Sequence, residues 1–273
     1  MGAPLIRIVS DVHYADHSSR VRSLEQLRPL FEGATSFVFN GDTLDTRPSK
    51  LPHHTDKARS EVLAFLASAG MPVTVLTGNH DPDLSPEHAI EFAHGQVLVT
   101  HGDVLFDNIV PWSKEAPLIR TKMIAALAAL PDGQSGLFEG RMRAFRSVAA
   151  SIPQKHQSER DPLKYAIRLA GDTVWPPQRA FTIMKAWRET PGRAAAFAGK
   201  HRPKAKFIVI GHTHKPGVWR TASGVVVVNT GSFCKPFGAM TADISGDALR
   251  VHRVVTRKGR FHVGGTVAEF PFA

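Results

Sequence analysis

The chain has 273 residues, enough for one large domain or for one domain with a sizeable insertion. Its composition, with 42% hydrophobic and 21% charged residues, is typical of a globular protein. Its longest apolar runs fall well short of the ~20 residues that span a bilayer. The net charge of +10 predicts an anionic partner: a phosphorylated substrate, nucleic acid, or an anionic membrane surface or lipid.

The cysteine count and the N-terminal residues predict a cytoplasmic protein. The single cysteine, Cys234, excludes an internal disulfide and fits a reducing compartment. Residues 1–7 lack a charged region followed by an apolar core, so we expect no secretory signal. Peripheral attachment to a membrane is compatible with this location because the chain is so basic.

Apolar, β-branched runs in the first hundred residues predict strands over residues 5–10, 35–40, 73–77 and 96–100. Apolar residues at helical spacing predict helices over about 19–31 and 57–68. Ser85, followed by Pro86, has the pattern of a helix N-cap with proline in the first helical position, which predicts another short helix. His53 and His54 fall in a polar loop, where we expect them to be exposed.

Residues 107–205 are different, because strand patterns disappear and helical spacing takes over. The apolar stripes are Ile119, Met123, Leu127 and Leu130; Leu137, Phe138, Met142, Phe145 and Val148; Leu163, Ile167 and Ala170 after Asp161–Pro162; and Phe181, Met184 and Trp187. The segment holds 17 Lys and Arg against 8 Asp and Glu, and therefore nearly all of the net charge. We expect core or lid-contact roles for Trp112, Trp175 and Trp187.

Strand patterns return over residues 206–210 and 225–229, and residues 239–244 and 248–255 read as a hairpin. The last ~15 residues fit a strand or a tail. The sequence therefore predicts an α/β core formed by residues 1–106 and 206–273, with a basic helical insertion, residues 107–205, as a lid.

Polar clusters follow five of the predicted strands. They are Asp11 and His13; Asp42 and Asp45; Asn79, His80 and Asp81; His101; and His212 and His214. In an open sheet flanked by helices, ligands bind beyond the carboxyl ends of the strands, so these clusters point toward one edge. Each cluster alone is weak evidence, because Gly-Asp commonly forms a turn and an isolated His-x-His is commonly a surface feature. Together they predict a shared site.

The residue types in these clusters suit metal ions. Carboxylate, amide and imidazole groups together match Mn, Fe, Co, Ni or Zn better than Ca or Mg. The lack of paired cysteines argues against a structural thiolate zinc site. Two such ions, ~3.5–4 Å apart and joined by a carboxylate, polarise a phosphoryl group and activate a bridging hydroxide for in-line attack.

The motif order is Asp-x-His, Gly-Asp-x-x-Asp, Gly-Asn-His-Asp, an isolated His after a strand, and Gly-His-x-His, and it spans residues 11–214. In the identity and order of these motifs, the chain resembles the calcineurin-like metallophosphoesterase superfamily. The resemblance implies a sandwich of two mixed β-sheets flanked by helices, with the motifs at strand ends. It also implies two divalent metal ions, of which Mn is the first expectation.

The resemblance further implies a role for each motif residue. The implied metal ligands are Asp11, His13 and His214 on one ion; Asn79, His101 and His212 on the other; and Asp42 as the bridge. His80 would face the phosphate, as a proton donor to the leaving group or a transition-state stabiliser. Asp81 would orient and polarise His80. Asp45 would be a further acid that supports these residues without binding a metal itself.

The expected function is a binuclear metal-dependent phosphoesterase that hydrolyses a phosphate ester or pyrophosphate by attack of a metal-bridging hydroxide. The insertion resembles the lid of UDP-2,3-diacylglucosamine pyrophosphatases, but those enzymes typically carry Arg at the position of His80. A lipid-precursor hydrolase is therefore one alternative, and a nuclease or cyclic-nucleotide phosphodiesterase is another. A non-catalytic binding module is disfavoured because Asp42, Asn79 and His80 are all present.

Overall fold

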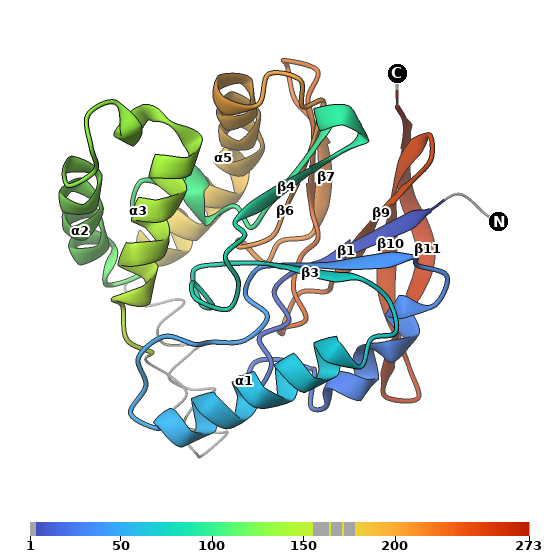
Figure 1. Ribbon diagram of the computed structural model, residues 1–273. Coiled ribbons are helices and arrows are strands. Elements are labelled where there is room, and N and C mark those ends of the chain that lie inside the picture. Colours follow the sequence, from blue (N-terminus) through green and yellow to red (C-terminus); the bar gives the residue numbers. More distant parts are fainter. Residues whose placement is uncertain (1–3, 155–163, 165–170, 172–177, 273) are drawn as a thin grey trace.

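The computed structural model describes residues 4–154, 164, 171 and 178–272 (Figure 1). Two mixed β-sheets pack face to face, and helices cover the outer face of each sheet. The predicted α/β sandwich is confirmed. In the described part of the chain, no helix is long and apolar enough to cross a membrane.

The first sheet has six strands in the order β11-β10-β9-β1-β2-β3. Their bounds are β1 Leu5–Val9, β2 Ser36–Asn40, β3 Val73–Leu76, β9 Met240–Ser245, β10 Ala248–Arg257 and β11 Arg260–Pro271. Strands β1, β2 and β3 are parallel, whereas β9, β10 and β11 form an antiparallel meander that joins the sheet through β1. The predicted hairpin is present, and the last residues form a strand rather than a tail.

The second sheet has five strands in the order β4-β5-β6-β8-β7. Their bounds are β4 Ala89–Phe92, β5 Val97–Thr100, β6 Phe207–Ile210, β7 Gly217–Arg220 and β8 Val226–Asn229. Strands β5, β6 and β8 are parallel and fully buried, and the short antiparallel strands β4 and β7 form the two edges.

The helices are α1 Pro52–Ala67, α2 Ala116–Ala128, α3 Phe138–Ala150 and α5 Gln178–His201, with short 3-10 helices η1 Leu24–Phe31, η2 Ala93–Gly95, η3 Asp103–Leu105 and η4 Gln134–Gly136. Helices α2, α3 and α5 lie together beside the five-stranded sheet, and α1 lies on the other side of the sandwich (Figure 1). The described helices between η3 and β6 are α2, η4, α3 and α5. We call this part of the chain, residues 107–205, the helical segment.

Alternating side chains divide the core into three layers. Ile8, Val38 and Val209 point into the space between the two sheets, while Phe37 and Phe39 point outward against η1 and α1. The third layer packs β5, β6 and β8 against α2, α3 and α5. Period-two alternation along a strand produces this division, and each large side chain buried in it contributes about 1.5–3 kcal/mol.

Three local predictions need correction. The sequence around Ser85 does not start a helix: the Ser85 hydroxyl accepts a hydrogen bond from the Glu87 N–H (3.1 Å), and the chain continues into β4, which pairs with β5. Only residues 24–31 of the predicted helix over 19–31 are helical, and they form η1, which contains Pro29. The helix predicted over residues 57–68 begins earlier, at Pro52, and is α1.

The exposed stripe on α5 also differs from expectation. Phe181 and Met184 are 67% and 50% exposed, so this face is not core. His53 and His54 are exposed as predicted, although they lie in the first turn of α1 rather than in a loop. The helix predicted after Asp161–Pro162, and Trp175, lie outside the described residues.

The two sheets meet at the carboxyl ends of their parallel strands. The Asn40 side chain at the end of β2 donates a hydrogen bond to the Thr100 carbonyl at the end of β5 (3.0 Å). The Ser10 hydroxyl after β1 lies 2.6 Å from the Thr230 hydroxyl after β8. These cross-sheet contacts bring the loops of both sheets to one place.

Candidate metal centre

Three of the predicted ligands converge after β1 and β6. His214 Nε2 lies 3.2 Å from Asp11 Oδ1 and 3.1 Å from His13 Nε2. His13 Nε2 in turn lies 3.9 Å from Asp11 Oδ1. Asp11 and His13 are buried, and the His214 side chain is 33% exposed. Donor atoms at these separations fit around one divalent ion with ligand bonds of about 2.0–2.2 Å.

A second group forms after β2, β3, β5 and β6. Asp42, His101 and His212 place ligand atoms within 4.8 Å of one another, and all three are buried. Asp42 Oδ2 also lies 3.7 Å from His13 Nε2 and 3.2 Å from His101 Nε2. The Asp42 carboxylate therefore stands between the two groups, where a bridging ligand would stand.

Two buried atoms of the second group lack hydrogen-bond partners within the described residues: Asn79 Oδ1 and His101 Nε2. A buried polar atom without a partner costs about 1–3 kcal/mol, so such atoms call for an explanation. His101 Nδ1 donates to the Asn40 carbonyl (3.0 Å), so Nε2 is the nitrogen that faces Asp42 and that binds a metal once the ring is neutral. His212 Nε2 donates to the Ile109 carbonyl (2.9 Å), which leaves its Nδ1 free. Both rings are thus fixed with one nitrogen available to a metal.

Two motif glycines allow the loops to come this close. A Cβ atom on Gly78 would lie 2.2 Å from Asp42 Oδ1, and one on Gly211 would lie 2.1 Å from Asp11 Oδ2. No other residue type fits at these positions without displacing a predicted ligand. The glycines of Gly-Asn-His-Asp and Gly-His-x-His therefore serve the ligands of other motifs.

Backbone strain is concentrated in the same residues. Asp11, His13, Asp42, His212 and His214 all have positive φ, between 47° and 65°. For residues other than glycine this conformation costs roughly 1–2 kcal/mol each. Five of the seven predicted ligands carry this cost, and strain of this kind gathers at functional sites.

A family model described as calcineurin-like phosphoesterase matches residues 5–216, which include all of these residues. The chain belongs to the calcineurin-like phosphoesterase family. It is therefore a metal-dependent hydrolase of phosphoric esters, and members of the family generally bind two divalent metal ions. The resemblance expected from the motif order is confirmed.

Among solved structures, the phosphoesterase chain is similar to vacuolar protein sorting 29 from Cryptosporidium parvum, with 14% identity, full coverage of both chains and a TM-score of 0.43. A dimetal phosphatase from Danio rerio shares 15% identity over 92% of this chain and 96% of its own, with a TM-score of 0.44. A predicted phosphoesterase from Streptococcus pneumoniae shares 15% identity over 100% and 99%, with a TM-score of 0.40. No curated protein matches the chain.

His80 lies at the open side of this phosphoesterase centre. Its ring centroid is 4.9 Å from that of His13, and its side chain is 30% exposed. Its Nδ1 lies 2.9 Å from Asp45 Oδ2 and 2.8 Å from Arg47 Nη2. Arg47 is itself held to Asp45 by two hydrogen bonds of 2.9 and 2.6 Å. Asp45 and Arg47 thus fix the ring and leave Nε2 free.

The predicted pairing of Asp81 with His80 is wrong, because Asp45 occupies that place. Asp81 is fully buried and accepts hydrogen bonds from the backbone N–H groups of Asp42 (3.0 Å), Thr43 (2.6 Å) and Gly78 (2.6 Å). It joins the loops after β2 and β3 and so fixes the position of Asp42. Sequence adjacency suggested the wrong carboxylate, because the turn directs Asp81 into the core.

The charged groups of the site influence one another strongly. Burial disfavours the charge on Asp42, but His101, His80 and His13 outweigh it and hold the pKa of Asp42 well below its usual range. Burial likewise opposes the charge on His80, as does Arg47, but Asp42 and Asp45 raise the pKa of His80 overall. Burial lowers the pKa of His212 to about 3, with His101 adding to the effect. The neutral ring of His212 is the form that binds metals.

Sequence reasoning missed three residues at this site. Arg47 follows Asp45 by two positions, and a basic residue after the Gly-Asp-x-x-Asp motif was an available signal. The buried thiol of Cys234 lies within 4.8 Å of the ligand nitrogens of His13 and His214, which no local pattern announces. Gln154, in the segment that follows α3, contacts the loop that carries Asp45 and Arg47.

The described tryptophans have packing roles next to the site. The Trp112 ring lies 5.4 Å from the His212 ring, between centroids, and packs against Phe106. Trp187 Nε1 donates a hydrogen bond to the Thr213 carbonyl (3.0 Å). Both therefore support the Gly-His-x-His loop from the helical segment.

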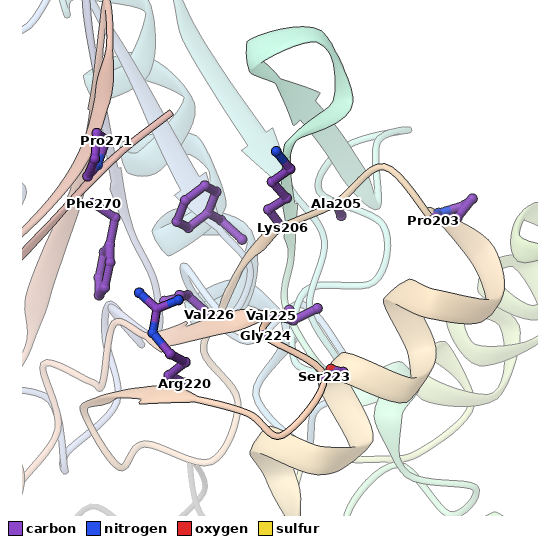
Figure 2. A pocket seen from close by; sticks show the side chains of 11 residues that line it. Pro203, Ala205, Lys206, Arg220, Ser223, Gly224, Val225, Val226, Phe270 and Pro271 are labelled. Carbon is purple, nitrogen blue, oxygen red and sulfur yellow. The ribbon is translucent and has the colours of Figure 1, made fainter. Parts of the chain in front are cut away.

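A hollow of about 450 Å³ lies at the opposite ends of β6 and β8, far along the strands from the metal ligands. Phe207, Val226 and Phe270 form its apolar wall, and Arg220 stands 5.8 Å from the Phe270 ring centroid (Figure 2). The hollow contains none of the predicted site residues.

Proposed function

We propose that this phosphoesterase hydrolyses a phosphate ester or a pyrophosphate by direct attack of water on phosphorus, at a site for two divalent ions. The observation that carries the proposal is that two buried atoms, Asn79 Oδ1 and His101 Nε2, make no hydrogen bond within the described residues, and that His101 Nε2 lies 3.2 Å from Oδ2 of the shared Asp42 carboxylate. Such atoms fit a bound cation, since a cation supplies the missing partner for both.

The ligand groups divide into two sets. Asp11, His13 and His214 would hold one ion, and Asn79, His101 and His212 the other, with Asp42 shared. Two bound ions would polarise the phosphoryl group and lower the pKa of the attacking water. The mixture of carboxylate, amide and imidazole donors favours Mn, with Fe, Zn, Ni or Co as alternatives.

His80 has the position of the group that faces the phosphate. Because Asp45 and Arg47 contact Nδ1, Nε2 is left available to a substrate at the partly exposed side of the ring. We infer that Nε2–H donates to the oxygen of the leaving group, while the Asp45 carboxylate keeps the ring in that orientation. The role of Asp81 is to hold the Asp42 backbone.

The helical segment contributes charge near the site. A hollow of about 380 Å³ between α2 and α5 is lined by Arg120, Lys185 and Arg193, together with Asp107 and Glu189. It adjoins the Ile109 turn, whose carbonyl binds His212. Glu189 is paired with Lys185 (3.8 Å) and Arg193 (3.0 Å), so the lining is charged but largely balanced, and it favours a polar substrate over acyl chains.

The test is a panel assay with Mn, Ni, Zn or Mg as the metal. The substrates are p-nitrophenyl phosphate, its bis-ester, a nucleotide pyrophosphate, UDP-2,3-diacylglucosamine and a single-stranded oligonucleotide. We expect metal-dependent turnover of at least one of them. On that substrate, His80→Ala should lower kcat by about 10²–10⁴-fold, the usual contribution of a proton donor, and leave the metal content at two ions.

His54→Ala is the matched control, because His54 is an exposed histidine on α1. It should leave both turnover and metal content unchanged. Wild-type turnover in the His80→Ala variant would overturn the role given to His80. Failure to bind two ions at saturating Mn would overturn the proposal as a whole.

A further inference from the structure

Gln154 links the helical segment to the loop that holds His80. Its side-chain Nε2 donates to the Asp45 carbonyl and to the Arg47 carbonyl, both at 2.8 Å. Its backbone N–H donates to the Pro48 carbonyl, also at 2.8 Å. Three hydrogen bonds thus attach the segment that follows α3 to residues 45–48, the 45–48 loop.

The orientation of this amide follows from its partners. Backbone carbonyls only accept hydrogen bonds, so the nitrogen of Gln154, and not its oxygen, must face Asp45 and Arg47. Gln154 Oε1 is buried and makes no hydrogen bond within the described residues. The amide nitrogen therefore binds two loop carbonyls, while the amide oxygen stays buried without a hydrogen bond within the described residues. An unpaired buried oxygen costs stability, and a role in holding the loop would account for that cost.

The 45–48 loop in turn contacts His80 at three points. Asp45 Oδ2 and Arg47 Nη2 both reach Nδ1 of the ring, at 2.9 and 2.8 Å. The Thr46 N–H donates to the His80 carbonyl at 2.8 Å. The ring and the backbone of His80 are therefore positioned by one short loop, whose two carbonyls bind Gln154.

We propose that Gln154 is a positioning residue for His80, through which the helical segment sets the orientation of the imidazole. This inference rests on the proposed function of His80. Its physical basis is that a side chain must be held within about 0.5 Å and 10–20° of its working geometry, by neighbours that are themselves fixed. Gln154 adds that restraint to the 45–48 loop, which is also held by the Thr46 N–H on the His80 carbonyl.

The experiment compares Gln154→Ala and the isosteric Gln154→Glu, both loaded with Mn, using aryl phosphates of graded leaving-group pKa. Glutamate keeps the volume but replaces the two N–H donors with a carboxylate facing two carbonyls. For both variants we expect kcat to fall by about tenfold, the lower end of the range for groups that orient site residues. KM should change by less than about twofold, because the loss falls on the transition state.

Dependence on the leaving group separates positioning from general damage. If Gln154 acts through His80, its loss should slow poor leaving groups most, as His80→Ala itself should. Metal content and thermal midpoint should stay close to those of the wild type. Gln178→Ala is the matched control: Gln178 is an exposed glutamine at the start of α5, and kcat should not change.

The double variant His80→Ala/Gln154→Ala completes the cycle. Without the imidazole there is nothing to position, so Gln154→Ala should change kcat by less than about twofold in that background. Additive losses would overturn the inference, as would unchanged kcat in both single Gln154 variants. If His80→Ala itself kept wild-type turnover, the proposed function of His80 would fail instead.

Discussion

Two buried ionic clusters lie on or beside β1, and they are built on opposite principles. Arg7, in the middle of the strand, donates to both carboxylate oxygens of Asp243 (2.9 and 2.6 Å) and to the carbonyls of Leu30 and Glu32 (2.7 and 2.9 Å). The metal centre, which begins at Asp11 just beyond the end of β1, instead has two buried atoms, Asn79 Oδ1 and His101 Nε2, that make no hydrogen bond in the described part of the chain.

The difference separates a cluster that stabilises the fold from one built for a ligand. Arg7 and Asp243 are 5% and 2% exposed, yet each charge faces its counterpart in good geometry. At the metal centre, by contrast, five predicted ligands adopt strained positive φ angles. The fold tolerates this strain because the sheets on both sides determine the loop positions, and a bound cation would complete the hydrogen-bonding and charge balance.

The same substitution in the two clusters should give opposite results, and the larger effect is at the metal centre. Asp42→Asn removes the charge from the shared carboxylate, so we expect loss of at least one metal ion and a fall in kcat of at least ~10³-fold, equivalent to ~4 kcal/mol of transition-state stabilisation. Metal analysis and kinetics with an active substrate of the panel measure both effects.

Without metal, Asp42→Asn should unfold almost as the wild type does. The partner His101 can release its proton when the neighbouring acid is neutralised, so no isolated charge is left behind. A large loss of stability in the metal-free variant, together with unchanged binding of two ions when Mn is added, would mean that the Asp42 cluster stabilises the fold in the manner of Arg7 and Asp243.

Asp243→Asn is the reciprocal prediction. The guanidinium of Arg7 cannot release its proton. The substitution therefore leaves a buried positive charge facing a neutral amide, with one acceptor oxygen, where the wild type has a carboxylate with two. We expect the free energy of unfolding to fall by about 3 kcal/mol, the lower end of the range for broken buried pairs. Urea denaturation of the metal-free proteins measures it. Affinity for Mn, measured below the unfolding transition, should be unchanged, and reduced affinity would contradict the separation of the two clusters.

The sequence predicted the fold well where the signal was local. The β-branched runs of β1, β2, β5, β6 and β8 are continuous and buried, so their periodicity and length identify them. Strand β7 was missed because Gly217 opens it and only four residues form it. Strand β4 was mistaken for a helix start, since Ser85 and Pro86 fit a helix cap and a turn equally well. Pairing with β5 decides between them.

The site was predictable as a set of residues and less so as a geometry. The strand ends bring the side chains of Asp11, His13, Asp42, His101, His212 and His214 together, because parallel strands deliver their following residues to one edge; their role as metal ligands stays a prediction. The partner of His80 was not predictable from adjacency, since Asp81 turns inward and Asp45 reaches across from another loop. The contact of Gln154 with the 45–48 loop joins residues about a hundred positions apart, which no local pattern encodes.

His88 provides the smallest test of the comparison, as a half-buried base with an arginine beside it rather than a carboxylate. Burial, and then Arg146, lowers the pKa of His88 to about 4 in the folded protein, against about 6.5 in the unfolded chain. Between these values the unfolded state binds the extra proton. The stability that His88 contributes is therefore complete above pH 6.5 and is lost as the pH falls toward 4.

We expect His88→Gln to lose less stability than the wild type when the metal-free protein is taken from pH 7 to pH 5. The difference should be about 1 kcal/mol or less, because the ring is partly exposed and its charge is screened by solvent. Urea denaturation at both pH values measures it, with His54→Gln as the exposed control that should follow the wild type. Equal acid sensitivity in the wild type and both variants would contradict this prediction. It would show that His88 accepts a proton in the folded protein as readily as in the unfolded chain, despite its burial beside Arg146.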